Sequence, residues 1–173
     1  WVKQYEIEVV PLSIVFGGQP FLDGIEMTAR DFYQRLASDP NHPTTSQPTP
    51  GAFLSAYKKA VEKGAEQVLV FTISSAMSGT VVSARQAAED SPIKVTVVDG
   101  KNNGMGLGWQ VIAAARAREA GSGLPEMEAA AEFVRDHMVY YVTLDTIDFL
   151  SRGGRIAGAI SFVNSFLKIK PLI

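Results

Sequence analysis

The sequence predicts an α/β protein with a largely parallel sheet and helices on both faces. Apolar, β-branched runs alternate with helical patterns along the middle of the chain, as βαβ units require. Of the 173 residues, 46% are hydrophobic and 20% are charged, which suits a globular protein with a sizeable core. This length corresponds to one domain, or to one domain and part of another.

Composition and charge exclude several classes of protein. The formal net charge of -2 gives no electrostatic footprint for nucleic acid, which argues against a transcription factor. The chain has no cysteine, and therefore no disulfide or thiolate nucleophile, so we expect a cytoplasmic protein. No apolar run approaches the roughly 18 residues that a membrane-spanning helix needs. Because the chain opens at Trp1 and stops where the sequence predicts the start of a strand, we interpret it as a piece of a larger protein.

The first elements are predicted from β-branched runs, turn residues and capping residues. Residues 5–16 are rich in Val and Ile and are expected to be extended, and the glycine pair 17–18 turns the chain. Thr28 and Asp31 have the spacing of a capping pair and start a helix. Residues 38–50, rich in Pro, Ser, Asn and Thr, are expected to form a loop.

Helices and strands alternate in the middle of the chain. Thr49 and Pro50 are suited to the N-cap and first positions of a helix that ends near Gly64. The elements expected after it are a strand at 67–73, a helix at 79–89, a strand at 93–98, an alanine-rich helix to about 120, a helix from 125 to 136, a strand at 139–142 and a short helix at 146–150.

Two hydroxyl-rich stretches each lead into a helix. Residues 74–80 connect an apolar strand to a helix, and residues 44–50 end in a capping Thr-Pro pair. Unpaired backbone N–H groups and the positive end of the helix dipole hold small anionic groups at such places. We interpret the two stretches as one site that holds a single anionic group, although either stretch alone would more often only cap its helix.

Other chemical candidates are weaker. The glycines at 104–108 do not have the G-x-G-x-x-G spacing of a dinucleotide fingerprint, and no phosphate-binding P-loop is present. An acyl- or phosphoryl-transfer enzyme that uses Ser78 as nucleophile is the alternative function. It would need a histidine base, but His42 lies in the proline-rich loop and His137 at the end of a helix. These separated histidines also argue against a metal site.

Charged residues near the expected sheet edge have more specific interpretations. Asp99 ends a strand, and we expect its carboxylate to accept N–H groups of the following turn. Arg152 and Arg155 flank two glycines, and either guanidinium could pair with a carboxylate or a phosphate.

The order of these motifs resembles the DegV family, whose members are fatty-acid-binding proteins that serve as acyl-carrying subunits of bacterial fatty acid kinase. The resemblance covers essentially the whole chain. The segments that carry it are Val10-Pro11-Leu12-Ser13, Thr44-Thr45-Ser46-Gln47-Pro48, Ser74-Ser75-Ala76-Met77-Ser78-Gly79-Thr80, Val98-Asp99, Gly153-Gly154-Arg155-Ile156 and Lys170-Pro171.

The resemblance implies a lipid-binding subunit without catalytic residues, metal or cofactor. It implies two α/β lobes, here residues 1–145 and the incomplete start of the second at 146–173, with a long-chain fatty acid such as palmitate between them. Thr45 and Ser78 would bind the carboxylate. Head-group or partner contacts would come from Ser46, Gly79, Thr80 and Arg155. An ATP-dependent kinase subunit would phosphorylate the carboxylate, and membrane contact would be transient at most.

This sequence departs from the family pattern in three places. The family's opening strand, which ends in T-D-S, is missing. The second lobe beyond Lys170-Pro171 is also missing, and with it the family's histidine that helps to bind the carboxylate. The family's aspartate-serine pair is Asp99-Gly100 here. The chain is therefore expected to hold at most half of the binding site. Met77, Met105 and Leu107 are candidates either for lining an acyl tunnel or for ordinary core.

Overall fold

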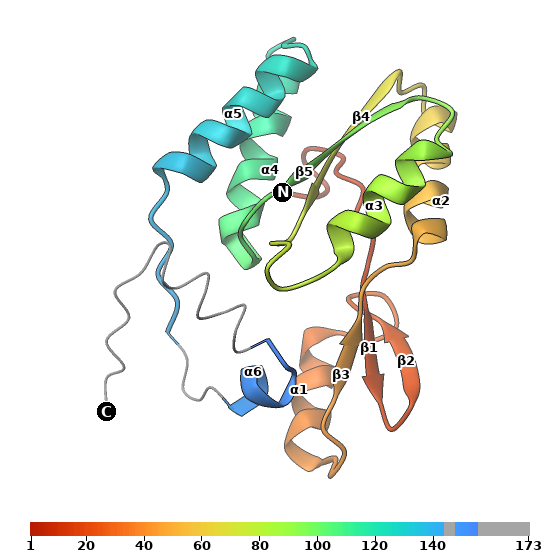
Figure 1. Cartoon of the computed structure of the whole chain (residues 1–173), viewed down its shortest axis with the longest axis vertical. Coiled ribbons are helices and arrows are strands. Elements are labelled where there is room, and N and C mark those ends of the chain that lie inside the picture. The colour runs from red at the N-terminus through yellow and green to blue at the C-terminus, as the bar shows by residue number, and fades with distance from the viewer. Residues whose placement is uncertain (144–147, 156–173) are drawn as a thin grey trace.

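The structure, a computed structural model, describes residues 1–143 and 148–155. Its elements are β1 (Ser13–Phe16), β2 (Gln19–Leu22), α1 (Ala29–Ser38), β3 (Thr44–Ser46), α2 (Pro50–Glu62), β4 (Gln67–Thr72), α3 (Thr80–Glu89), β5 (Lys94–Asp99), α4 (Gly104–Glu119), α5 (Leu124–His137) and α6 (Asp148–Arg152). Figure 1 shows that they form two parts, which we call the parallel part (α2–α5 with β4 and β5) and the antiparallel part (β1–β3 with α1).

The parallel part has helices on both faces of its strands, which confirms the expected α/β class. β4 and β5 pair in parallel, from Gln67 opposite Lys94 to Thr72 opposite Asp99. Helices α2 and α3 lie on one side of this pair, and α4 and α5 lie on the other (Figure 1). The first side is closed by a cluster of buried residues from α2 and α3 against valines of both strands; its buried members are Phe53, Tyr57, Ala84 and Ala87.

Within this cluster one polar group is buried and satisfied. The Tyr57 hydroxyl donates to the Ala84 carbonyl oxygen at 3.1 Å and thereby joins α2 to α3. Burial raises the pKa of Tyr57 to about 12, because the phenolate would lose its hydration. The raised pKa stabilises the fold up to about pH 10, and this stabilisation is lost as the pH rises through the folded-state pKa.

The antiparallel part is a second sheet of three strands in the order β2-β1-β3. Gly17 and Gly18 connect β1 to β2 with φ angles of 56° and 84°, the left-handed backbone that a tight hairpin requires. Buried Ile14, Phe16 and Met27 pack the sheet against α1. Helix α1 begins at Thr28, whose capping box with Asp31 confirms the expected start.

Two expected elements differ in the structure. The segment 38–50 was expected to be entirely loop, but Thr44–Ser46 forms β3, which pairs with Ser13–Val15 of β1. These residues form a strand because they pair with the free edge of β1, which is distant in sequence. The strand expected at 139–142 is wrong: these residues pair with no strand of the described part of the chain, and Val139 and Tyr141 are exposed.

The end of the chain is described only in part. The described residues of α6 run from Asp148 to Arg152, so the helix expected to end at 150 continues past it, and its expected start at 146 lies outside the described residues. The predicted boundary between residues 145 and 146, and the strand expected near 169–173, fall outside the described residues. The division into two lobes therefore stays a prediction.

Candidate functional site

The loops that follow β4 and β5 are joined to each other at the carboxyl ends of the two strands. The Gly100 N–H donates to the Thr72 carbonyl oxygen at 3.0 Å, and the Ser74 N–H donates to the Asn102 carbonyl oxygen at 2.9 Å. Residues 74–80 and 99–108 therefore lie together at one sheet edge. This is where open α/β sheets place their ligands. The sequence predicts that residues 44–50 also converge at this edge, but Thr44–Ser46 lies in the other sheet.

Asp99 ties these loops together and is not free to bind a ligand. One of its carboxylate oxygens accepts the N–H of Ser75 at 3.2 Å and the N–H of Lys101 at 3.0 Å. Partial burial by itself would raise the pKa of Asp99, but hydrogen bonds from Ser75 and Lys101 outweigh this effect and lower it below the ordinary value. The expectation that Asp99 accepts N–H groups of the following turn is confirmed.

Asp99→Asn should make the fold less stable at neutral pH, by about 1 kcal/mol for a partly exposed charged hydrogen bond. Because the folded-state pKa is lowered, this stabilisation is present above about pH 4 and is lost as the pH falls through the folded-state pKa. Urea unfolding at several pH values should show the difference between wild type and variant shrinking below pH 4. Asp90→Asn, at an exposed carboxylate after α3, is the control; an equal effect there would contradict a specific role for Asp99.

Ser78 lies directly before α3 and is half-buried. Its Oγ accepts the Thr80 N–H at 3.3 Å and lies 2.8 Å from Thr80 Oγ1, so the two hydroxyls share a hydrogen bond. Gly79, between them, is the N-cap residue and contributes no side-chain hydrogen bond. Ser78 thus caps the Thr80 N–H, and its hydroxyl lies at the positive end of the helix dipole, where an anion is stabilised.

Thr45 and Ser46 lie on β3, in the antiparallel part, and both are exposed. The backbone of Thr45 pairs with that of Ile14. The stretch that contains them is connected to α3 by the next residue, since Gln47 Nε2 donates to Ser83 Oγ at 2.9 Å. The two hydroxyl-rich stretches are therefore held together through Gln47, and binding of one group by Thr45 and Ser78 stays a prediction.

Arg155, 78 residues from Met77, reaches the same loop. Its Nε donates to the Met77 carbonyl oxygen at 3.4 Å, and its terminal guanidinium nitrogen donates to the Gly153 carbonyl oxygen at 2.6 Å. The guanidinium thus lies next to the residue that precedes Ser78, and it is exposed. A cation in this place can pair with an anionic head group.

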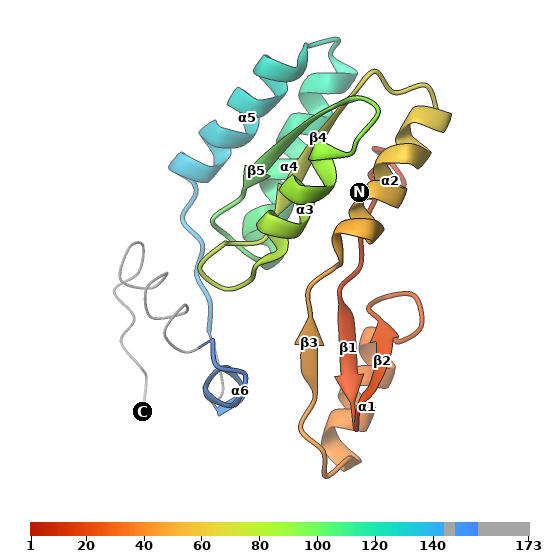
Figure 2. The same ribbon diagram turned by 45° about the vertical axis from the view of Figure 1, so that its right-hand side comes forward.

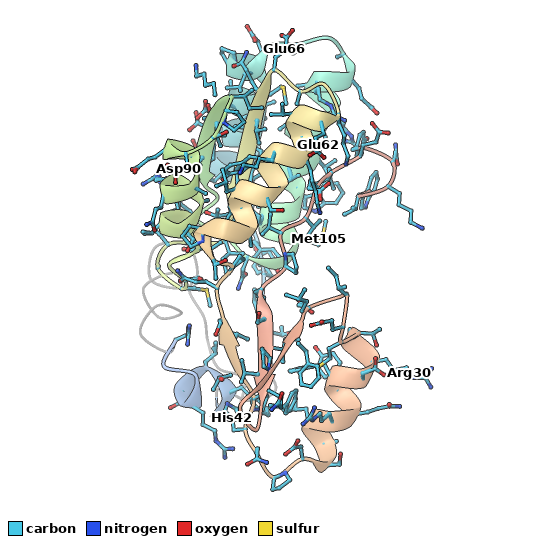
Figure 3. The ribbon with its side chains drawn as sticks, turned by 90° about the vertical axis from the view of Figure 1, so that its right-hand side faces the viewer. Arg30, His42, Glu62, Glu66, Asp90 and Met105 are labelled. Carbon is cyan, nitrogen blue, oxygen red and sulfur yellow. The ribbon has the colours of Figure 1, made fainter. Side chains whose placement is uncertain are left out.

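Apolar residues flank the loops that follow β4 and β5. Leu107 packs over Gly100, where a Cβ would lie 2.4 Å from Leu107 Cδ1 and 2.9 Å from the Thr72 carbonyl oxygen, so a side chain at position 100 has no room. Met77 Sδ accepts a weak hydrogen bond from Asn103 at 3.6 Å. Met105 is 44% exposed, at the end of the parallel part that faces the antiparallel part (Figure 3).

A hollow of about 330 Å³ lies along α4, α5 and the segment after α5. Its lining residues are Trp109, Ile112, Ala113, Arg116, Val134, Met138, Val139 and Tyr140. Tyr140 connects the hollow to the site, because a Cβ on Gly104 would lie 2.8 Å from its hydroxyl. The sequence analysis missed these residues, although Trp109, Ile112 and Arg116 have the spacing of one helix face.

Neither histidine supports nucleophilic or metal chemistry at this site. His42 stacks on Phe149 of α6, with ring centroids 5.5 Å apart, and His137 stacks on Phe133 at 4.1 Å. Figure 3 shows His42 at the end of the antiparallel part beside α6. Within the described residues, no group of three or more His, Asp or Glu side chains could hold a metal ion. In the same part of the chain, no helix has the length and apolar character to cross a membrane.

The geometry defines an α/β protein with two loops joined at the carboxyl edge of a parallel strand pair, and with hydroxyls at the start of the following helix. The chain belongs to the DegV family, described as "uncharacterised protein, DegV family", whose sequence profile matches residues 1–173. A DegV domain-containing protein of Deinococcus radiodurans is 42% identical over 164 residues, which cover 95% of this chain and 58% of that protein.

Solved structures show the same fold. A fatty-acid-binding DegV family protein of Thermus thermophilus matches with a TM-score of 0.81 and 36% identity, over 96% of this chain and 59% of that one. DegV of Bacillus subtilis, also a fatty-acid-binding protein, matches with a TM-score of 0.83 and 29% identity, over 98% and 61%. The chain thus spans about three fifths of the length of these proteins.

Proposed function

We propose that this chain supplies the first lobe of a protein that binds a long-chain fatty acid such as palmitate. The observation that carries the proposal is the Ser78 hydroxyl at the start of α3, where it accepts the Thr80 N–H, with a second hydroxyl-rich stretch connected to the same helix through Gln47. Family membership supports it, because the Thermus and Bacillus relatives are fatty-acid-binding proteins and a relative from Eubacterium ventriosum binds stearic acid.

The chemistry of the site suits a carboxylate better than a polyphosphate. Ser78, Thr80, Thr45 and Ser46 are neutral donors, and Arg155 is the cation that contacts the loop. One negative charge is balanced by hydroxyls, a helix N-terminus and one arginine, whereas a triphosphate needs several cations or a metal. We infer that Thr45 and Ser78 hold the carboxylate, with Ser46, Gly79, Thr80 and Arg155 around it.

The protein is proposed to present the acid rather than to react with it. Among the described residues, Ser78 Oγ bonds to Thr80 and to no base that would activate it as a nucleophile. The carboxylate would instead be phosphorylated by an ATP-dependent kinase subunit that approaches from the side of Arg155. The alternative, acyl or phosphoryl transfer through Ser78, predicts a covalent adduct on Ser78 that mass spectrometry would detect.

The hollow beside α4 is proposed to take part of the acyl chain. It has a volume of about 330 Å³, an apolar lining, and Tyr140 at the end near Gly104 and the loops. Pockets of this size and character hold small apolar ligands. Met77, Met105 and Leu107 would then lie near the head group rather than along the chain.

Ala113→Phe should fill this hollow and shorten the acyl chain that the protein accepts. Affinity for an 18-carbon acid should fall by about tenfold, roughly the loss of burying two methylene groups, while affinity for a 10-carbon acid should change little. Isothermal titration with both acids measures this, and Ala117→Phe on the same helix, outside the lining, is the matched control. Equal changes in affinity for both acids would show that the acyl chain of the ligand does not occupy this hollow.

The direct test is to identify the lipid that the full-length protein carries. Native mass spectrometry of protein purified without added lipid should show a mass increase that corresponds to a long-chain fatty acid, and denaturation should release it. The Thr45→Ala, Ser78→Ala double variant should show the increase at a much lower occupancy. Absence of any fatty acid, together with no binding of added palmitate, would overturn the proposed function.

A further inference from the structure

Gln47 makes the hydrogen bond that joins the two parts of the molecule. Its Nε2 donates to Ser83 Oγ at 2.9 Å, and Ser83 is 4% exposed in the second turn of α3. Within the described part of the chain, no other hydrogen bond connects residues 12–47 to residues 50–155. Figure 2 shows that β3 runs directly into α2 at this junction. The position of β3 relative to α3 therefore depends on this side chain.

Gly79 provides the space in which Gln47 lies. A Cβ on Gly79 would be 2.5 Å from Gln47 Oε1 and 3.2 Å from both Cδ and Nε2. The backbone of Gly79 has φ -76° and ψ 9°, a conformation that any residue adopts. A side chain at position 79 would therefore displace the Gln47 amide, although the backbone of Gly79 does not itself need glycine.

The contact joins the segments that carry the two proposed carboxylate ligands. Thr45 lies on β3, and Gln47 directly follows Ser46, the last residue of this strand. Ser78 precedes Gly79 directly. We propose, on the basis of the proposed function, that Gln47 is a positioning residue: by lying on Gly79 and bonding to Ser83, it sets the distance between the Thr45 and Ser78 hydroxyls that makes the site selective for a carboxylate.

The test measures selectivity for a head group, which a loss of stability alone would not change. Binding of palmitic acid and of 1-hexadecanol to the full-length protein is compared in wild type, Gln47→Ala and Ser83→Ala. We expect each variant to lose about tenfold in affinity for the acid and little for the alcohol, because only the acid uses both hydroxyls. Gln86→Ala, at an exposed glutamine of α3, is the control and should keep the wild-type ratio.

A second comparison probes the packing on Gly79. Gly79→Ala should lower the affinity for the acid when Gln47 is present, since the new methyl group displaces the amide, and should add little loss in the Gln47→Ala background. Thermal melting is recorded for every variant, and Gln47→Ala, which removes an exposed side chain, is expected to fold.

The outcomes separate this inference from the proposed function. The wild-type protein could prefer the acid, lose this preference in Ser78→Ala, and keep it in Gln47→Ala and Ser83→Ala. That result would overturn only the role of Gln47. Equal losses for acid and alcohol in Gln47→Ala would also overturn it, and would leave a purely structural contact. A wild-type protein without preference for the acid would overturn the carboxylate site itself, and the inference with it.

Discussion

Ser78→Ala is expected to weaken fatty acid binding by about 1–3 kcal/mol, which is the cost of losing a hydrogen bond to a charged group. The hydroxyl is also a helix cap, because it accepts the Thr80 N–H at 3.3 Å. The variant should therefore lose some stability too, about 1 kcal/mol. Titration with palmitate and thermal melting of the same protein measure the two effects.

Ser78→Asp separates capping from ligand binding. An aspartate can accept the Thr80 N–H and favours the positive end of α3, so the stability should stay at or above that of Ser78→Ala. Its negative charge would repel the ligand carboxylate, so palmitate binding should fall further than in Ser78→Ala. Ser55→Ala, on the exposed side of α2, is the control for loss of a hydroxyl. If palmitate affinity changes in parallel with stability across these variants, Ser78 acts only as a helix cap and not as a ligand-binding residue.

The parts of the fold that were predictable from the sequence depend on neighbouring residues. The capping box of Thr28 with Asp31 and the Thr49 cap on the Ala52 N–H are short-range patterns, and both helices begin where expected. β4, α3 and β5 were also predictable, because the spacing of apolar residues along the chain changes from that of a strand to that of a helix and back. These elements carry the loops of the candidate site, which is why the meeting of residues 74–80 with 99–108 was also predictable.

The parts that were not predictable depend on partners distant in sequence. Thr44–Ser46 is a strand because β1 offers a free edge, whereas 139–142 has no partner strand among residues 1–143 and 148–155. The contact of Gln47 with Ser83 crosses 36 residues and has no local signal. The hollow forms only where α4, α5 and Tyr140 come together in space. Its lining residues on α4 do recur with the spacing of one helix face.

Arg155 shows how far a motif can predict a role before geometry is known. The pair of glycines before it and its guanidinium suggest an anion-binding residue, and the structure adds that it contacts the loop of Ser78 through the Met77 carbonyl oxygen. Its shorter bond, 2.6 Å, is to the Gly153 carbonyl oxygen within its own turn. A role in closing that turn and a role at the head group thus predict different effects of removing the side chain.

Arg155→Ala, in the full-length protein with the kinase subunit and ATP, is expected to lower the rate of acyl phosphate formation by roughly 10- to 1000-fold, the range for removing a group that stabilises developing charge. Palmitate affinity should fall by less than about tenfold, because the hydroxyls and the helix N-terminus still hold the carboxylate. Arg152→Ala, an exposed arginine of α6, is the matched control and should leave the rate nearly unchanged. The turn-closing role predicts the opposite pattern: a lower melting temperature in Arg155→Ala with normal turnover. That result would remove Arg155 from the head-group site, whereas normal melting with slow phosphorylation would place it between the bound acid and its kinase.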